Sequence, residues 1–342
     1  MSQLNNDLIR EFPYTPLEDQ DAVAASRQMH QLVDNIETVI AGKRRVVVLA
    51  VLALIAEGHV LIEDVPGTGK TSLVSSLAKS IDCGYSRIQF TPDVMPSDVT
   101  GFSIYNQKTG EFEFRQGAAM SNIVLADEIN RASAKTQSSM LEIMEEKQVT
   151  VDSHTYRMEK PYMVLATQNP IEQLGTYQLP EAQIDRFMIK FSIGYPSYQD
   201  EVRVIMTGEK AKSEIQPCLS QSEIVHLIED RHRVIVSREM SGYIVSLITA
   251  TRNHEDIRLG SSPRGSIALY ELSRSYALFQ GRNYVVPDDI RFLAPYVLGH
   301  RIILTHKAKT EKKNGVKVIE EIVRNIVVPT EPDQTGRERP RR

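Results

Sequence analysis

The apolar positions along the chain follow two different patterns, which meet near residue 195. Before that point, short apolar runs without alternation recur between helical stretches, as is typical of strands covered on both faces. After it only helical patterns occur, several of them beginning with a Ser or Asp cap. We therefore expect an α/β domain with a mostly parallel sheet flanked by helices, followed by a smaller, all-helical domain. The runs interpreted as strands are 59–64, 85–90, 121–126, 162–167 and 187–193.

The same patterns give the expected boundaries of these parts. The α/β domain begins with two helical patterns, which end at Gly42 and Gly58. The C-terminal end is polar and contains proline, so we expect it to be disordered, with nucleic-acid binding by its arginines as the alternative. The expected parts are an N-terminal extension (1–21), the α/β domain (22–195), the helical domain (196–326) and a disordered tail (327–342).

Two segments of the α/β domain have the alternating pattern of β-hairpins. They are 101–117, with a turn at "QKTG", and 148–159, with a turn at "DSHT". We expect each to present one apolar face, and the sequence leaves open whether that face is a plain surface feature or binds a partner. In the first hairpin the apolar residues are Phe102 and Ile104 before the turn and Phe112 and Phe114 after it.

Length and composition are those of a globular protein. The 342 residues suit about two domains, and 41% apolar and 25% charged residues are ordinary values. The longest apolar run, 46–56, is shorter than the ~20 residues of a membrane helix, so we interpret it as a buried helix and expect no membrane insertion. The N-terminus lacks the basic and apolar segments of a secretory signal, which favours a cytoplasmic location.

The residues that often bind metals are scattered. Cys83 and Cys218 form no C-x-x-C pair, and the eight histidines form no cluster. We therefore expect no metal ion held by side chains alone, while magnesium delivered with a nucleotide stays open.

The segment "LIEDVPGTGKTSLVSSL" at 61–77 indicates phosphate binding. The pattern G-x-x-x-x-G-K-[ST] has its first glycine where this chain has Asp64. That position lies at the strand exit, farthest from the phosphates, and Asp tolerates unusual backbone angles, so we still interpret the segment as a phosphate-binding loop. Lys70 is expected to reach the β- and γ-phosphates, and Thr71 to bind magnesium. The residues expected to hold the nucleotide here are Pro66, Gly67, Thr68, Gly69, Lys70, Thr71 and Ser72.

Acidic, amide and basic residues at other places complete the expected chemistry. The apolar run of "NIVLADEINRA" ends in Asp127, expected to hold magnesium, and Glu128, expected to polarise the attacking water. Asn169 follows a third run and could bind the γ-phosphate or that water. A single arginine is usually a surface ion pair, but Arg186 just before a strand and Arg264 in the first turn of a helix both occupy places that favour a functional role.

Together these motifs resemble those of AAA+ ATPases, and among them the MoxR family. The resemblance covers about residues 27–302, and in this family the first loop position is commonly not glycine. It implies a P-loop AAA+ core with a C-terminal helical lid. The matching segments are "EDVPGTGKT", "RIQFTPDVMPSDVTG", "LADEINRASAKTQSSMLEIMEEKQVTV", "VLATQNPIEQLGTYQLPEAQIDRF" and "SPRGSIAL".

The resemblance also implies a role for each candidate residue. Gly42 would flank the adenine, with a plain helix stop as the alternative, and both hairpins would face the pore of a ring or a partner. The implied catalytic residues are Glu128 of the Walker B motif, Asn169 as sensor 1, Arg186 as arginine finger and Arg264 as sensor 2, acting in the same subunit or a neighbouring one. Lys70, Thr71 and Asp127 would bind phosphate and magnesium.

The function that the resemblance implies is that of a chaperone-like ATPase. We expect a ring, implied to be hexameric, that uses ATP and Mg²⁺ to remodel, assemble or activate a protein client. Metal cofactor insertion is one such task. The resemblance also implies a partner that contains a von Willebrand factor A domain. The alternative is a nucleic-acid-associated AAA+ motor, but the net charge of −4 and the pI near 6.1 argue against it. A nucleotide-gated binding module is a third hypothesis, against which Glu128 and Arg186 weigh.

Overall fold

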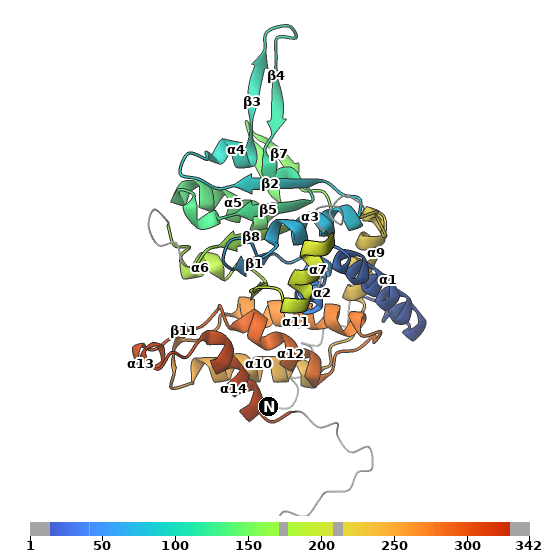
Figure 1. Ribbon diagram of the computed structural model, residues 1–342, viewed down its shortest axis with the longest axis vertical. Helices are drawn as coiled ribbons and strands as arrows, with labels where there is room; N and C mark the ends of the chain where they lie inside the picture. Colours follow the sequence, from blue (N-terminus) through green and yellow to red (C-terminus); the bar gives the residue numbers. More distant parts are fainter. Residues whose placement is uncertain (1–13, 41, 171–176, 208–214, 329–342) are drawn as a thin grey trace, which may run out of the picture.

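The computed structural model describes residues 14–40, 42–170, 177–207 and 215–328. Most of the expected N-terminal extension and nearly all of the expected tail lie outside these ranges. At the centre is a five-stranded parallel sheet (Figure 1), which confirms the strands expected from the apolar runs. In spatial order its strands are β2 (Tyr85–Gln89), β5 (Ile123–Asp127), β8 (Met163–Gln168), β1 (Val60–Glu63) and β9 (Ile189–Phe191).

Helices cover both faces of the sheet, which explains why its inner strands are apolar without alternation, whereas the edge strand β2 is only partly buried. One buried cluster contains Leu61, Val124 and Val164 and packs against the helices of one face. The other contains the alternate positions, such as Ile62 and Leu125, and continues into the helices after residue 215, so both parts of the chain share this core. The helices of the first cluster are α4 (Pro96–Thr100) and α5 (Ala134–Glu146), and those of the second are α1 (Asp19–Glu37), α2 (Arg44–Ile55) and α3 (Lys70–Ser80).

The expected buried helix is confirmed, since α2 is buried at every residue from Val46 to Ile55. None of the helices in the described ranges has the length and apolar character that crossing a membrane requires.

The C-terminal part is helical except for a two-stranded antiparallel ribbon, β10 (Ile257–Leu259) with β11 (Ile303–Leu304). The sequence pattern did not predict these two strands, because they are short and lie between helices. Side chains of Ser220, Ser237, Ser262, Thr305 and Asn314 cap five of the helices, as their residue types favour. The helices of this part are α9 (Gln221–His232), α10 (Arg238–Arg252), α11 (Pro263–Phe279), α12 (Pro287–Leu298), α13 (His306–Thr310) and α14 (Gly315–Asn325), and α12 is the one without such a side-chain cap. Short elements η1 (Ala118–Met120), η2 (Ile129–Arg131), α6 (Glu181–Ile184) and α7 (Tyr198–Thr207) complete the fold.

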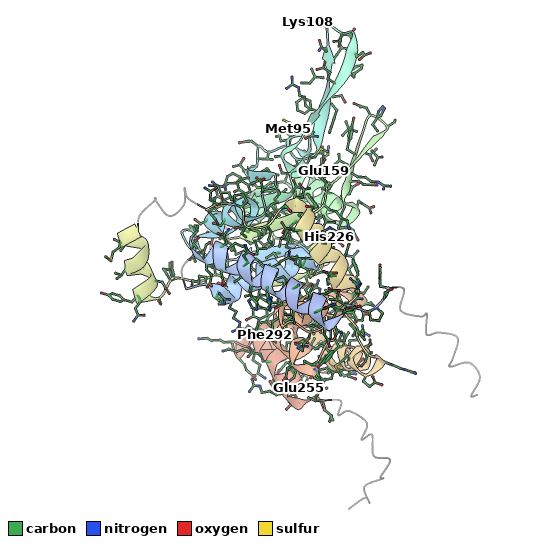
Figure 2. All side chains as sticks on the ribbon, turned by 90° about the vertical axis from the view of Figure 1, so that its right-hand side faces the viewer. Met95, Lys108, Glu159, His226, Glu255 and Phe292 are labelled. Carbon is green, nitrogen blue, oxygen red and sulfur yellow. The ribbon has the colours of Figure 1, made fainter. Side chains whose placement is uncertain are left out.

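Both hairpins are present, and the first projects from the end of the molecule opposite the C-terminal helices α10, α12 and α14 (Figure 1). Lys108 lies at its tip, far from Met95 near its base (Figure 2). The first hairpin consists of β3 (Gly101–Asn106) and β4 (Glu111–Gln116), and the second of β6 (Gln148–Val151) and β7 (His154–Arg157).

The expectation of one apolar face on the first hairpin is wrong. Phe102 lies opposite Arg115, whereas Phe112 lies opposite Tyr105. Because residues directly opposite each other share a face, Phe102 and Phe112 point to opposite sides. One face is therefore mixed, and the other is aromatic. At the base of the aromatic face, Phe114 stacks on Tyr156 of the second hairpin, with ring centroids 4.1 Å apart.

Candidate nucleotide site

The loop between β1 and α3 has the backbone that phosphate binding requires. Gly67 and Gly69 adopt φ of 84° and 92°, the left-handed region that glycine tolerates best. A methyl group at either position would meet no atom within 4 Å, so the space beside the loop is open. Gly69 is also the N-cap of α3, and no side chain caps this helix, which leaves its first N–H groups available to an anion.

Asp64 has a structural task at the position where the pattern has glycine. Its buried carboxylate accepts hydrogen bonds from the backbone N–H of Ile193 at 2.8 Å, of Gly194 at 2.7 Å and of Val65 at 2.9 Å, and from the hydroxyl of Ser192 at 3.2 Å. The residue thus joins the start of the loop to the chain that follows β9. A glycine could make none of these contacts.

Two lysines bind backbone carbonyls around the loop. Lys70 donates from Nζ to the carbonyl oxygens of Asp64 at 2.9 Å and Val65 at 3.2 Å. Lys43 donates to those of Ile193 at 2.8 Å and Tyr195 at 2.6 Å. The segment after β9 is therefore held from both sides, by Asp64 and by Lys43.

Gly42 lies close to this segment, next to Lys43. Its φ is 74°, and the carboxylate of Asp200 occupies the space into which a side chain at position 42 would project. Glycine is thus required here by a close approach as well as by the backbone angle. Its contact with adenine stays a prediction.

The acidic pair lies at the same edge of the sheet as the loop. Asp127 ends β5, and its carboxylate accepts from the hydroxyl of Thr167 and from Arg87, both at 2.7 Å. The hydroxyl of Thr167 in turn accepts the backbone N–H of Glu128 at 2.8 Å. One buried threonine on β8 therefore fixes both acidic residues.

Glu128 is held at its backbone and at its carboxylate. Its φ of 56° places it in the left-handed region, where a non-glycine residue is uncommon. Its Oε2 accepts from Gln89 at 2.9 Å and pairs with Arg131 at 3.3 Å. Asn169, which is buried, directly follows β8, the strand between β5 and β1. The structure thus brings Lys70, the acidic pair and Asn169 to the carboxyl edge of the sheet.

The two candidate arginines lie at the opposite edge. Arg186 precedes β9, whose first residue Ile189 pairs with Val60 at the start of β1, whereas the loop follows the end of β1. At ~3.3 Å per residue, β1 alone separates the two edges by about 10 Å. Arg186 and Arg264 line a cleft of about 240 Å³ and share the carboxylate of Glu145, with Arg186 at 3.0 Å.

Comparison with known proteins agrees with this geometry. Residues 59–189 match the model of the "ATPase family associated with various cellular activities (AAA)", and residues 249–322 match the AAA lid domain. The chain is 37% identical over 310 residues to Chaperone MoxR1 of Mycobacterium tuberculosis, covering 88% of this chain and 82% of that protein. The chain belongs to the MoxR family of AAA+ ATPases.

Two further relatives of this MoxR chain cover nearly its whole length. It is 49% identical over 315 residues to YeaC of Bacillus subtilis, named only as an uncharacterized protein, covering 90% of this chain and 98% of the other. A crystal structure from Cytophaga hutchinsonii, described as that of a candidate ATPase, superposes with a TM-score of 0.84 at 37% identity, covering 91% and 98% of the two chains.

Sequence reasoning missed several residues at the site of this MoxR chain. Arg87 and Gln89 contact the acidic pair from β2, and Glu145 holds both arginines. The sequence did contain a sign of Arg87 and Gln89. Polar and apolar residues alternate in "YSRIQF", which indicates that one face of this strand is exposed and not, as we expected, buried on both faces. Thr167 and Glu145 carried no such signal.

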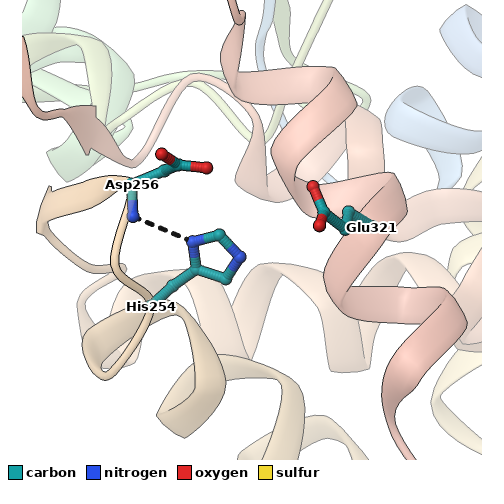
Figure 3. Close-up of side chains that lie close together, drawn as sticks. All are labelled: His254, Asp256 and Glu321. Carbon is teal, nitrogen blue, oxygen red and sulfur yellow. Dashed lines mark hydrogen bonds between the residues drawn. The ribbon is translucent and has the colours of Figure 1, made fainter. Parts of the chain in front are cut away.

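One group of possible metal ligands occurs in the lid, but it does not fit a metal ion. His254, Asp256 and Glu321 lie close together (Figure 3). The carboxylate of Asp256 already pairs with Lys313 at 2.5 Å, and the Nδ1 of His254 accepts the backbone N–H of Asp256 at 3.1 Å. The neutral ring therefore carries its proton on Nε2, the nitrogen that would have to bind the ion.

Proposed function

We propose that this MoxR-family chain is a ring-forming ATPase that hydrolyses ATP with Mg²⁺ to remodel, assemble or activate a protein client. The observation that carries the proposal is the division of the site between the two edges of the sheet. Lys70 and Glu128 lie at one edge, and Arg186 and Arg264 at the other. A head-to-tail ring, implied to be hexameric by the family resemblance, brings the arginine edge of one subunit to the loop edge of the next.

The residues at the loop edge suit a magnesium nucleotide. The hydroxyl of Thr71 and the carboxylate of Asp127 are hard oxygen donors of the kind that Mg²⁺ prefers. Each oxygen of Asp127 accepts one hydrogen bond here, and a carboxylate oxygen can accept two, so capacity remains. When bound, the ion neutralises charge on the phosphates.

Each protein group then has one task. Lys70 and the N–H groups of the loop residues 66–72 bind and orient the phosphates. Glu128 accepts a proton from the attacking water, which Asn169 helps to position. Arg186 of the neighbouring subunit, with Arg264 beside it, stabilises the negative charge that develops on the transferred phosphoryl group.

The client and its partner are proposed on different grounds from the nucleotide site. One relative is named a chaperone, which supports action on a protein. Metal cofactor insertion, a partner with a von Willebrand factor A domain, and a cytoplasmic location rest on the family resemblance and on sequence. The first hairpin, with Tyr105 and Phe112 exposed at its aromatic face, is the surface we assign to partner binding.

Two substitutions test the role assignments. Lys70→Ala should abolish nucleotide binding, because the ammonium contacts the ground-state phosphates, whereas Glu128→Gln should keep binding and lose hydrolysis. Lys79→Ala, on the exposed side of the same helix, is the matched control and should change neither. Calorimetry in which Glu128→Gln binds nucleotide as poorly as Lys70→Ala would refute the assignment.

Mixing mutants tests whether the site forms between subunits. Glu128→Gln and Arg186→Ala should each be nearly inactive alone. In an equal mixture, chance pairing gives about a quarter of interfaces with an intact Glu128 facing an intact Arg186, so activity should partly return. Absence of recovery at every mixing ratio, with subunit exchange verified by fluorescence, would reject the shared site.

A further inference from the structure

Arg301, which lies between α12 and β11 in the lid, uses four of its five donors on the segment Asp185–Met188 around Arg186. Its Nε donates to the Asp185 carboxylate at 2.9 Å, and its two amino groups donate to the carbonyl oxygens of Asp185 at 3.1 Å, Phe187 at 2.6 Å, Met188 at 2.9 Å and Val297. The side chain is 2% exposed. Burial lowers the pKa of Arg301 to about 10, against the opposing effect of Asp185, so it stays a cation at neutral pH.

These contacts fix the backbone on both sides of Arg186. The carbonyls of the preceding and following residues, Asp185 and Phe187, bind the same amino group of Arg301. Four carbonyls and one carboxylate accept the five N–H donors of the Arg301 guanidinium. No other type of side chain has five donors in this planar arrangement. The position of the Arg186 backbone is therefore set by a residue of the lid.

The carboxylate of Asp185 extends the cluster to Arg264. Its second oxygen accepts the hydroxyl of Ser262 at 2.9 Å. Ser262 is the N-cap of α11, and its oxygen accepts the backbone N–H of Arg264 at 3.2 Å. Asp185 thus binds Arg301 on one side and the helix end that carries Arg264 on the other.

We propose that Arg301 and Asp185 are positioning residues that hold Arg186 and Arg264 together in the geometry required at the neighbouring subunit's nucleotide. This rests on the proposed function, in which the two arginines act across an interface. Because its side chain is buried and its donors bind residues of its own chain, Arg301 acts only through Arg186 in this arrangement. The Nε of Arg186 is buried without a hydrogen-bond partner among the described residues, so the contacts of Arg301 and Asp185 leave this donor unused in that part of the chain.

Two conservative variants test the proposal. Arg301→Lys keeps the charge but cannot reach five acceptors, and Asp185→Asn keeps the size but cannot accept from both of its donors. Each should lower kcat by about 10- to 100-fold, the cost of displacing a catalytic group by ~1 Å, with KM and ADP affinity unchanged. If Arg301→Lys does not fold, Asp185→Asn decides the outcome.

The matched control is Arg282→Lys. Arg282 forms a similar pair within the lid, to both oxygens of Asp289 at 2.9 and 2.6 Å, but touches nothing near Arg186. This variant should lose comparable stability and keep its kcat. A kcat in Arg301→Lys and Asp185→Asn no lower than in the control would overturn the proposal.

Mixing separates the positioning role from a structural one. A subunit with Arg301→Lys still offers intact Lys70 and Glu128, so mixing it with Glu128→Gln should restore activity as far as the mixture with Arg186→Ala does. Recovery with Arg186→Ala but not with Arg301→Lys overturns the positioning role alone. Recovery in neither mixture refutes the shared site, and the positioning role with it.

Discussion

Replacing Asp64 by glycine gives the loop its usual first residue, and we expect it to destabilise the protein. The carboxylate accepts four hydrogen bonds, three of them from backbone N–H groups of Val65, Ile193 and Gly194. Glycine leaves these donors without their acceptor, and each unsatisfied buried donor costs about 1–3 kcal/mol.

The expected loss is smaller than the sum of these costs. Water can reach some of the freed donors, and removing a buried carboxylate recovers part of its desolvation penalty. Glycine itself lowers the free energy of unfolding by about 0.5–1 kcal/mol more, because it makes the unfolded chain more flexible. We expect Asp64→Gly to lose about 2–4 kcal/mol of unfolding free energy.

Urea unfolding measures this loss. The chain has no tryptophan, so circular dichroism of the helices is the suitable signal. Ser192→Ala is the matched control, since it removes only the longest of the four hydrogen bonds and should cost about 1 kcal/mol. An unchanged midpoint for Asp64→Gly at unchanged slope would show that the carboxylate contributes nothing. Tighter nucleotide binding would show that glycine suits the loop better.

Three further predictions concern other contacts. Glu145→Gln should raise basal ATPase activity, because the carboxylate of Glu145 competes with the nucleotide for Arg186 and Arg264. The expected increase is roughly 2- to 5-fold, which corresponds to the free energy of a weak exposed ion pair, and a decrease would contradict this. Burial lowers the pKa of His59 to about 4, so the unfolded chain binds a proton that the folded chain rejects, and stability should fall as pH drops from 6.5 to 4. His59→Asn should flatten that fall in urea titrations, leaving the part due to His300 and His232, whose pKa values burial also lowers. A double-mutant cycle of Phe114→Leu and Tyr156→Leu should give a coupling of about 0.5–1.5 kcal/mol in thermal unfolding, and additive effects would exclude a stabilising stack.

The parts of the fold that could be predicted depend on neighbours in sequence. The apolar runs identify the inner strands β5, β8 and β1 because these are buried on both faces, and the loop is recognisable because two glycines, a lysine and a helix follow one another. Most contacts of Asp64 could not be predicted, since three of its four partners lie more than 120 residues away and two of these are backbone N–H groups, which almost any residue offers. Thr167 was missed because its partners, Asp127 and Glu128, also lie far away in sequence, at the end of another strand.

The first hairpin was predicted from its alternating pattern, but the faces on which its apolar residues lie were not. Both strands alternate, but which faces coincide depends on the number of residues in the turn. With Asn106 opposite Glu111, even-numbered residues of one strand face odd-numbered residues of the other. Phe102 and Phe112 are both even-numbered, so they lie on opposite faces.

The pairing of β9 with β1 explains why the proposed site needs a second subunit. Strand β9 has Arg186 before its amino end, and the segment that Asp64 binds after its carboxyl end. Its three residues pair with β1 in fixed register, from Val60 with Ile189 to Ile62 with Phe191. Moving Arg186 to Lys70 of the same chain would break this pairing, the contacts of Asp64 and the four hydrogen bonds that Arg301 donates to the segment Asp185–Met188. A neighbouring subunit reaches the loop edge without breaking any of them, so the register of one short strand favours a site shared between subunits over one completed within the chain.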